Sequence, residues 1–244
     1  MGHWPGVSRQ LVVVVTCCCA GSIGAGQERA ARKQLTVERI YSQPSLSGRP
    51  VRGLVWAPDG KTVSFFETAG AGKEAKTELW AMDAATGERR VLVSAEKLAS
   101  MLPEEKGRAS QATGAARRPP AEYQWAADGL GLLFVGAKAL AWLDLRAQAA
   151  RVLVSGKEAV SDAKISPDGR YVSFVREHNL WLVGVADGKE RALTKGGTEE
   201  IRKGELDWVY PEELEIKTGY WWAPDASAIA RLRTRTMPRR GSAT

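Results

Sequence analysis

Four segments of the chain repeat one pattern, and this repetition constrains the fold more than any other feature of the sequence. Each segment has an alternating apolar run, a turn resembling Pro-Asp-Gly and a second alternating run. Because proline presets the first turn position and glycine tolerates positive φ, the pattern predicts a β-hairpin. The segments are LVWAPDGKTVSFF (54–66), YQWAADGLGLLFV (123–135), AKISPDGRYVSFV (163–175) and YWWAPDASAIARL (220–232).

A second predicted hairpin follows three of these segments, at residues 78–93, 139–154 and 179–194. Each complete unit therefore supplies four short strands, which is typical of a β-propeller blade. The turn aspartates are 69, 40 and 57 residues apart, so the repeat carries insertions of different lengths. We expect an all-β fold, a partial β-propeller of four-stranded antiparallel blades, with about three and a half blades visible. Propellers usually close with about 4 to 8 blades, so we do not expect this chain to close alone.

The first insertion, residues 95–120, is rich in Ala, Lys, Glu and Arg and has no strand periodicity. It predicts a short helix or a loop between blades.

The first 26 residues have the order of a secretory signal peptide. Arg9 precedes an apolar run from Leu11 to Ala20, which is shorter than the roughly 20 residues of a membrane span, and small residues follow. We expect cleavage near Gly24–Gly26, a secreted or periplasmic protein, and no transmembrane anchor in the mature chain. A lipoprotein is the less favoured alternative, because Thr16 is a poor residue before an acceptor cysteine.

The composition of the mature chain excludes several classes of function. All three cysteines lie in the predicted signal peptide, at positions 17–19, so disulfides and thiol catalysis are not expected. His178 is the single histidine outside that segment, which is too few for a histidine metal cluster, and we interpret it as a strand or turn residue. No feature indicates a metal, nucleotide or organic cofactor.

The net charge of +7 does not indicate a nucleic-acid partner. Five arginines and no acidic residue occur in residues 231–244, so the other 230 residues carry only +2. We therefore predict a basic tail at 233–244 rather than a basic stripe on a folded face.

The segment DWVYPEELEIKTGYWW (207–222) contains two adjacent carboxylates, Glu212 and Glu213, among aromatic residues. On a strand, neighbouring side chains point to opposite faces. Pro211 suits the first position of a helical turn, which would place the two carboxylates about 100° apart. They could then hold one ammonium group, with Trp208 and Tyr210 as walls that lower the local dielectric.

Two simpler interpretations stay open at this point. Adjacent glutamates in a loop are usually solvated, and the aromatic residues of the segment could fill blade cores. For Trp221 and Trp222, which correspond to the positions of Trp56 and Trp125 in other units, we expect at least one to be a core residue.

The string DWVYPEEL, followed by GYWWAPD, resembles the amino-terminal β-propeller of the dipeptidyl peptidase IV family of serine exopeptidases, particularly its secreted bacterial members. The segments LTVERIYSQPSLSGRPVRGLVWAPDGK, YQWAADG and VREHNLWLV extend the resemblance over residues 35–232. In that family the propeller caps an α/β-hydrolase domain, and an adjacent glutamate pair holds the α-ammonium of the peptide substrate. The resemblance therefore implies substrate binding by Glu212 and Glu213.

The catalytic residues that the family implies are not found in this sequence. It contains no Gly-x-Ser-x-Gly motif, and its single mature histidine lies in a predicted blade. Arg108, Arg117 and Arg118 give no secure match to a propeller arginine that assists binding in some members. The resemblance stops near Leu232, before the basic tail, which predicts a frameshift or a truncated gene model.

We therefore expect the substrate-recognition segment of a secreted dipeptidyl peptidase IV-like serine exopeptidase, inactive alone, with an α/β-hydrolase domain as its partner in the intact protein. The alternative is a non-catalytic exported propeller that serves as a protein-interaction module.

Overall fold

The computed structural model describes residues 35–42, 46, 51–70, 75–102 and 122–235. The predicted signal peptide and Arg108, Arg117 and Arg118 lie outside the described residues. Contacts divide the chain into two units, residues 1–49 and 50–244. In the first unit, helix α1 (Val37–Tyr41) begins where the Thr36 hydroxyl accepts a hydrogen bond from the Arg39 N–H, at 3.2 Å.

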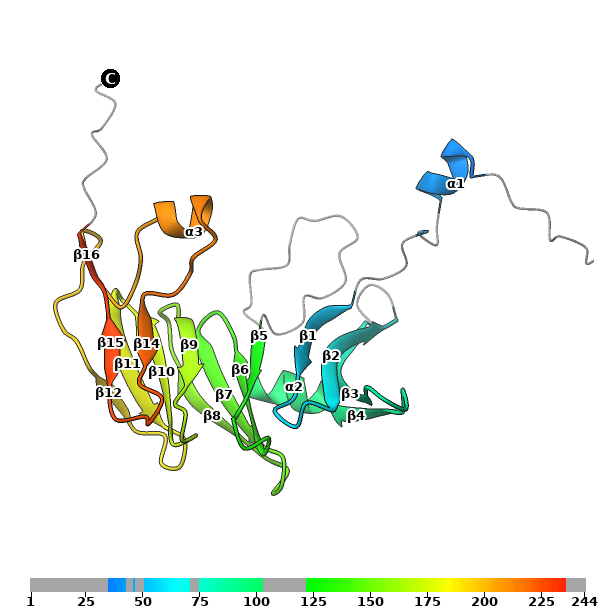
Figure 1. Cartoon of the computed structure of the whole chain (residues 1–244), viewed down its shortest axis with the longest axis horizontal. Coiled ribbons are helices and arrows are strands. Elements are labelled where there is room, and N and C mark those ends of the chain that lie inside the picture. Colours follow the sequence, from blue (N-terminus) through cyan, green and yellow to red (C-terminus); the bar gives the residue numbers. More distant parts are fainter. Residues whose placement is uncertain (1–34, 43–45, 47–50, 71–74, 103–121, 236–244) are drawn as a thin grey trace, which may run out of the picture. The chain divides into compact units, whose positions relative to one another are not determined.

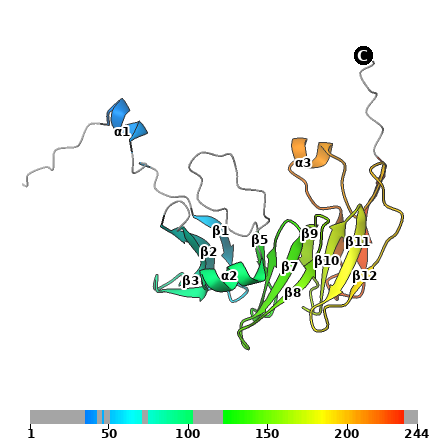
Figure 2. The ribbon, with the colours of Figure 1, turned by 180° about the vertical axis from the view of Figure 1, so that it is seen from behind.

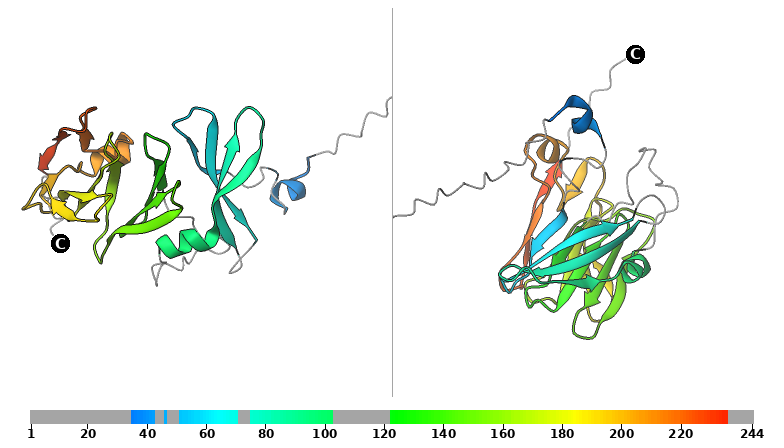
Figure 3. Two further views of the ribbon diagram at one scale, coloured as in Figure 1. Left: turned by 90° about the horizontal axis from the view of Figure 1, so that it is seen from below. Right: turned by 90° about the vertical axis from the view of Figure 1, so that its right-hand side faces the viewer.

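Three four-stranded antiparallel sheets form most of the second unit (Figures 1 and 3), and each takes its strands in chain order. This confirms the predicted fold class and the pairing of two hairpins in each unit. The strands are β1 (Arg52–Trp56), β2 (Thr62–Ala69), β3 (Lys76–Asp83) and β4 (Arg89–Val93) in the first sheet, β5 (Glu122–Trp125), β6 (Gly131–Val135), β7 (Ala139–Asp144) and β8 (Ala149–Ser155) in the second, and β9 (Ser161–Ile165), β10 (Tyr171–Arg176), β11 (Asn179–Gly184) and β12 (Glu190–Ala192) in the third.

The turn aspartates close the first hairpin of each sheet through their side chains. Asp59 Oδ1 accepts hydrogen bonds from the N–H groups of Lys61 and Thr62, both at 2.8 Å. The aspartates at 128, 168 and 225 each accept from the N–H two residues later. The residue after the aspartate has a positive φ in all four turns: it is Gly60, Gly129, Gly169 and, in the last turn, Ala226. These hairpins are therefore fixed by local chemistry, as the sequence predicted.

Helix α2 (Ala95–Met101) occupies the start of the first insertion, which confirms a short helix there. It contacts β3 and β8 (Figure 2) and buries Leu98 and Met101. The helices of the described residues are all too short to cross a membrane, and α2, with seven residues, is the longest of them.

The apolar cores lie between neighbouring sheets rather than within single sheets. Phe66 and Leu79 of the first sheet pack in one cluster with Phe134 of the second sheet. Leu133 of the second sheet packs in another cluster with Phe174 of the third. Each sheet therefore depends on its neighbour to bury its side chains.

Two of the contacts between sheets contain the same buried polar cluster, which we call a seam. In the first seam, the Trp125 Nε1–H of β5 donates to Ser64 Oγ of β2 at 2.9 Å, and the Tyr123 hydroxyl lies 2.7 Å from the same oxygen. In the second seam, Trp222 Nε1–H donates to Ser173 Oγ at 2.8 Å, and the Tyr220 hydroxyl lies at 3.1 Å.

Both seam serines are fully buried, and both follow their turn aspartate by five residues. In the second sheet this position is Leu133, which packs in one cluster with Ala163 of the third sheet. Ala163 corresponds in the repeat to Tyr123 and Tyr220 of the two seams. Burial raises the pKa of the Tyr123 phenol to about 12, and burial also raises the pKa of the Tyr220 phenol. Both phenols therefore stay neutral hydrogen-bonding groups at ordinary pH.

The remaining strands form two short ladders along one continuous stretch. Strand β14 (Tyr220–Trp222) pairs with β15 (Ile229–Arg231), and β13 (Ile201–Lys203) pairs with β16 (Arg233–Arg235). The first three residues of the predicted basic tail thus form a strand; the other residues of that tail lie outside the described part of the chain.

Candidate functional site

The segment that carries Glu212 and Glu213 lies between β13 and β14, which pair with two consecutive parts of one stretch, residues 229–235. Gly204, after β13, donates its N–H to the Leu232 carbonyl at 2.9 Å, and Leu232 donates its own N–H to the Gly219 carbonyl at 2.8 Å. Residues 205–218, which we call the excursion, therefore begin and end opposite the same residue, Leu232.

Two glycines form the neck of the excursion. A Cβ on Gly219 would lie 2.8 Å from the Glu205 nitrogen and from the Gly204 carbonyl carbon, and backbone atoms cannot give way there as a flexible side chain could. Gly204 has a φ of 79°, which favours glycine. The close approach of the two strand ends therefore depends on residues without side chains.

Helix α3 (Val209–Glu213) forms the tip of the excursion, beyond the end of β14 (Figure 1). The Asp207 carboxylate accepts a hydrogen bond from the Val209 N–H at 2.8 Å. Pro211 is the third helical residue, not the first as the sequence suggested. It still lies in the first turn, where an N–H has no partner within the helix. Glu215, with a φ of 54°, takes a left-handed conformation just after the helix ends.

Glu212 and Glu213 are consecutive residues of α3, and both are exposed. Their side chains leave the helix about 100° apart, so both can reach a group beyond the tip of the excursion. Neither carboxylate has a hydrogen bond or an ion pair with any residue that the structure describes. Their negative charge is therefore available to a cation from outside.

The aromatic residues near the pair divide into buried and exposed groups. Tyr220 is fully buried, and the half-buried Trp222 donates to Ser173 in the second seam, so Trp222 is the one of the two tryptophans that faces the core. Trp221 lies on the other face of the same strand and is 47% exposed. Trp208 and Tyr210, at the start of α3, are 45% and 41% exposed.

The first leg of the excursion, residues 205–208, is held by polar contacts of Glu205 with the third sheet and with β13. Glu205 Oε2 lies 2.8 Å from His178 Nδ1, and Glu205 Oε1 lies 3.2 Å from Arg202. His178 and Glu177 both have positive φ and form the two-residue turn between β10 and β11, so His178 is a turn residue as predicted. Its imidazole attaches a loop to a sheet, and the structure gives it no serine or cysteine partner among the described residues.

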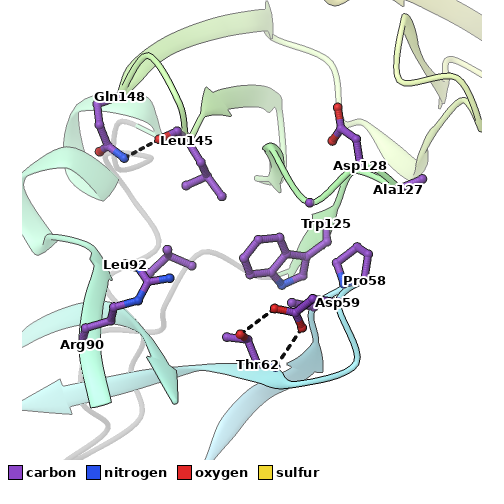
Figure 4. A pocket seen from close by; sticks show the side chains of 12 residues that line it. Pro58, Asp59, Thr62, Arg90, Leu92, Trp125, Ala127, Asp128, Leu145 and Gln148 are labelled. Carbon is purple, nitrogen blue, oxygen red and sulfur yellow. Dashed lines mark hydrogen bonds between the residues drawn. The ribbon is translucent and has the colours of Figure 1, made fainter. Parts of the chain in front are cut away.

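The grooves between sheets are separate from the glutamate pair. A groove of about 460 Å³ between the first and second sheets contains Trp125, Pro58, Asp59 and Arg90 (Figure 4). Asp59 is engaged there by the N–H and hydroxyl groups of its own turn, including Thr62. Within the described residues, no three His, Cys, Asp or Glu side chains are arranged to bind a metal ion. The glutamate pair does not line this groove, and it is the better candidate site because its charges have no partner among the residues that the structure describes.

Comparison with known proteins places the excursion in a recognised family. A model of the dipeptidyl peptidase IV (DPP IV) N-terminal region matches residues 136–237, which include α3 and both glutamates. Residues 136–237 are a DPP IV N-terminal region. The family match ends at residue 237, five residues beyond Leu232, where the resemblance in the sequence stopped.

Relatives of this DPP IV N-terminal region include long fungal proteins. The chain is 37% identical over 97 residues to a probable dipeptidyl-aminopeptidase B of Chaetomium globosum and 40% identical over 79 residues to dipeptidyl aminopeptidase A of Saccharomyces cerevisiae. These matches cover 38% and 32% of this chain. The chain thus spans only 10% and 8% of the length of those relatives.

The crystal structure of Porphyromonas gingivalis dipeptidyl peptidase 4 resembles the fold, with a TM-score of 0.58 and 23% identity. That match covers 75% of this chain and 25% of the other protein, so the likeness of fold extends beyond the segment that the family model matches.

The attachment of the excursion was not predicted from the sequence. Glu205 and Thr218 gave no motif, because their partners His178 and Asp162 are distant in the chain. Gly204 and Gly219 at the two ends of a non-repeating segment were the one available signal.

Proposed function

We propose that this chain is the substrate-recognition segment of a dipeptidyl peptidase IV-like serine exopeptidase, and that Glu212 and Glu213 bind the α-ammonium group of a peptide. The observation that carries the proposal is a pair of adjacent, exposed carboxylates on α3 without partners among the described residues, within a segment of the DPP IV family. An ammonium group offers three hydrogen-bond donors, so it can bind two carboxylates at once.

The charge of the excursion favours a cationic ligand. It contains five acidic residues and one lysine, and among the described residues only Glu205 of those acids has an ion pair with a cationic side chain, that of Arg202 in β13. The Asp207 carboxylate is occupied by the Val209 N–H at the start of α3. The negative potential at the tip therefore comes mainly from Glu212, Glu213 and Glu215, which attract a positive group as it approaches.

Recognition of the amino terminus would set a fixed distance from that terminus to any reacting bond. An enzyme built on this segment would therefore remove a unit of constant length from the amino end of a peptide. The 244 residues contain no Gly-x-Ser-x-Gly motif, and His178 attaches the excursion, so we propose that these residues bind peptides and do not cleave them. A chromogenic Xaa-Pro substrate should remain intact in their presence, and turnover that survives purification would contradict this.

Peptide titration of the 244-residue chain tests the binding site. We expect an Ala-Pro amide with a free amino terminus to bind and its N-acetyl derivative not to bind. Glu212→Gln and Glu213→Gln each weaken a charged hydrogen bond worth about 1.5–3 kcal/mol, so each should reduce affinity roughly 10- to 150-fold. Calorimetry or NMR titration measures the affinity.

Glu215→Gln is the matched control, because Glu215 is exposed on the same excursion but lies after the end of α3. It should change affinity less than either substitution in α3. Equal binding of the acetylated and free peptides, with no effect of the α3 substitutions, would contradict the proposal and favour a non-catalytic interaction module.

A further inference from the structure

The position of α3 cannot come from its own packing. None of its five residues is buried, and residues 214–217, which follow it, are all exposed. A short helix of this kind is not stable in isolation. The direction in which Glu212 and Glu213 point must therefore be set where the two legs of the excursion meet the sheets.

The two legs are anchored in different ways. The first leg has an apolar anchor, because Leu206 is only 4% exposed, in addition to the contacts of Glu205. The second leg has no buried side chain between the end of α3 and Gly219. Its last residue, Thr218, is the only partly buried one, so the second leg depends on the contacts of that threonine.

Thr218 binds a lysine and an aspartate of strand β9. Its hydroxyl donates to Asp162 Oδ2 at 2.9 Å, and Lys164 Nζ donates to the same hydroxyl and, at 2.6 Å, to Asp162 Oδ1. The three side chains thus form a closed set of hydrogen bonds. Lys164 also lies 3.6 Å from the ring centroid of Tyr220, the residue next to the neck.

These side chains are sheltered from water. The side chains of Lys164 and Asp162 are 25% and 19% exposed, and burial lowers the pKa of the Lys164 ammonium although Asp162 opposes the shift. Asp162 has a φ of 48°, a left-handed conformation that aspartate tolerates better than most residues. Charged hydrogen bonds in such a place are stronger than exposed ones.

We infer that Thr218, held by Lys164 and Asp162, is a positioning residue that fixes the second leg of the excursion and thereby aims Glu212 and Glu213 at their ligand. The inference rests on the proposed function for its ligand, a peptide α-ammonium group. The attachment itself can be measured without any ligand.

The test compares Thr218→Val with Thr218→Ser in the 244-residue chain. Valine keeps the shape of threonine and removes the hydroxyl, whereas serine keeps the hydroxyl. The first readout is amide hydrogen exchange at Leu214 and Ile216, whose N–H groups both donate to the Tyr210 carbonyl at 3.1 Å. The second readout is the affinity for the Ala-Pro amide with a free amino terminus.

We expect Thr218→Val to accelerate exchange at these two amides about tenfold and to weaken peptide binding about tenfold, while Thr218→Ser stays near wild type. Exchange in β10 should not change. Lys164→Met, which keeps a long apolar chain over the Tyr220 ring, is the second variant and should reproduce the effect of the valine.

Unchanged exchange at Leu214 and Ile216 in both Thr218→Val and Lys164→Met would overturn the inference, as would faster exchange throughout β9–β12 or a failure of serine to restore the wild-type rate. If wild type does not bind the peptide but Thr218→Val still accelerates exchange at the two amides, the attachment stands and the proposed function fails.

Discussion

The contacts between neighbouring sheets differ in the side chain at one repeated position, five residues after the turn aspartate. Ser64 and Ser173 occupy equivalent positions, and each accepts the indole N–H of a tryptophan from the next sheet. Where leucine stands at that position, as at Leu133, the next sheet offers apolar residues instead. The contacts between sheets therefore alternate between polar seams and an apolar contact, and the residue five positions after the turn aspartate distinguishes them.

Replacement of a seam serine should destabilise the fold. In Ser173→Ala, the Trp222 N–H loses its acceptor and Tyr220 loses one partner in a fully buried place, which costs about 1–3 kcal/mol. Urea unfolding of the full chain measures the change. Ser155→Ala, on an exposed position of β8, is the control and should change the free energy of unfolding by less than about 0.5 kcal/mol. Equal effects of the two substitutions would refute the seam as a stabilising contact.

The sequence predicted local features at this scale and missed distant ones. The aspartate turns follow from residues two or three apart, so the pattern was enough. The seams join residues 47 to 61 positions apart, and no local rule identifies such pairs. The exposure of Trp221 and the burial of Trp222 depend on the strand phase, since neighbouring side chains point to opposite faces.

At the scale of elements, the excursion is the feature that the repeat pattern could not predict. The sequence placed the glutamate segment between the third and fourth units, whereas the structure places it between β13 and β14, whose partner strands β16 and β15 are separated by Leu232 alone. Pro211 correctly indicated a helical turn, and the adjacent carboxylates lie on that turn. The sequence did not show that β13 and β14 pair with consecutive parts of residues 229–235, because the excursion separates them in the chain.

A single methyl group added at Gly219 should destabilise the neck of the excursion. Gly219→Ala places a Cβ 2.8 Å from backbone atoms on the opposite side of the neck, so the strand ends must separate. Overpacking of this kind costs about 1–3 kcal/mol. We expect faster amide exchange at Leu232, whose N–H donates to the Gly219 carbonyl, together with a lower melting temperature.

Gly156→Ala provides the comparison, since its added Cβ has no neighbour closer than 4.0 Å. That chain should melt at or slightly above the temperature of wild type. A Gly219→Ala chain that melts at the same temperature and keeps slow exchange at Leu232 would show that the neck has room for a side chain.

At the scale of the whole molecule, neighbouring sheets share their apolar cores, so we expect them to unfold in one transition. Leu133 is fully buried in a cluster formed by the second and third sheets, so neither sheet retains its core alone. Leu133→Ala should lower the free energy of unfolding by about 2–5 kcal/mol and leave one cooperative transition. Tryptophan fluorescence and circular dichroism should report the same midpoint in urea.

Val152→Ala, at a position of β8 that is 42% exposed, is the matched control and should have a much smaller effect. Separate midpoints for the two signals would mean that the sheets unfold independently, contrary to the arrangement of their cores.

The neck of the excursion also bears on how recognition could change during evolution. Because Gly204 and Gly219 both meet Leu232, the ladders on either side keep their pairing whatever the length of the segment between them. Insertions, deletions or entire replacement loops can therefore be accepted there without a shift in the surrounding strands. Ligand preference can diversify at this point while the blades stay constant, and a loop from another protein could be grafted at the same two glycines.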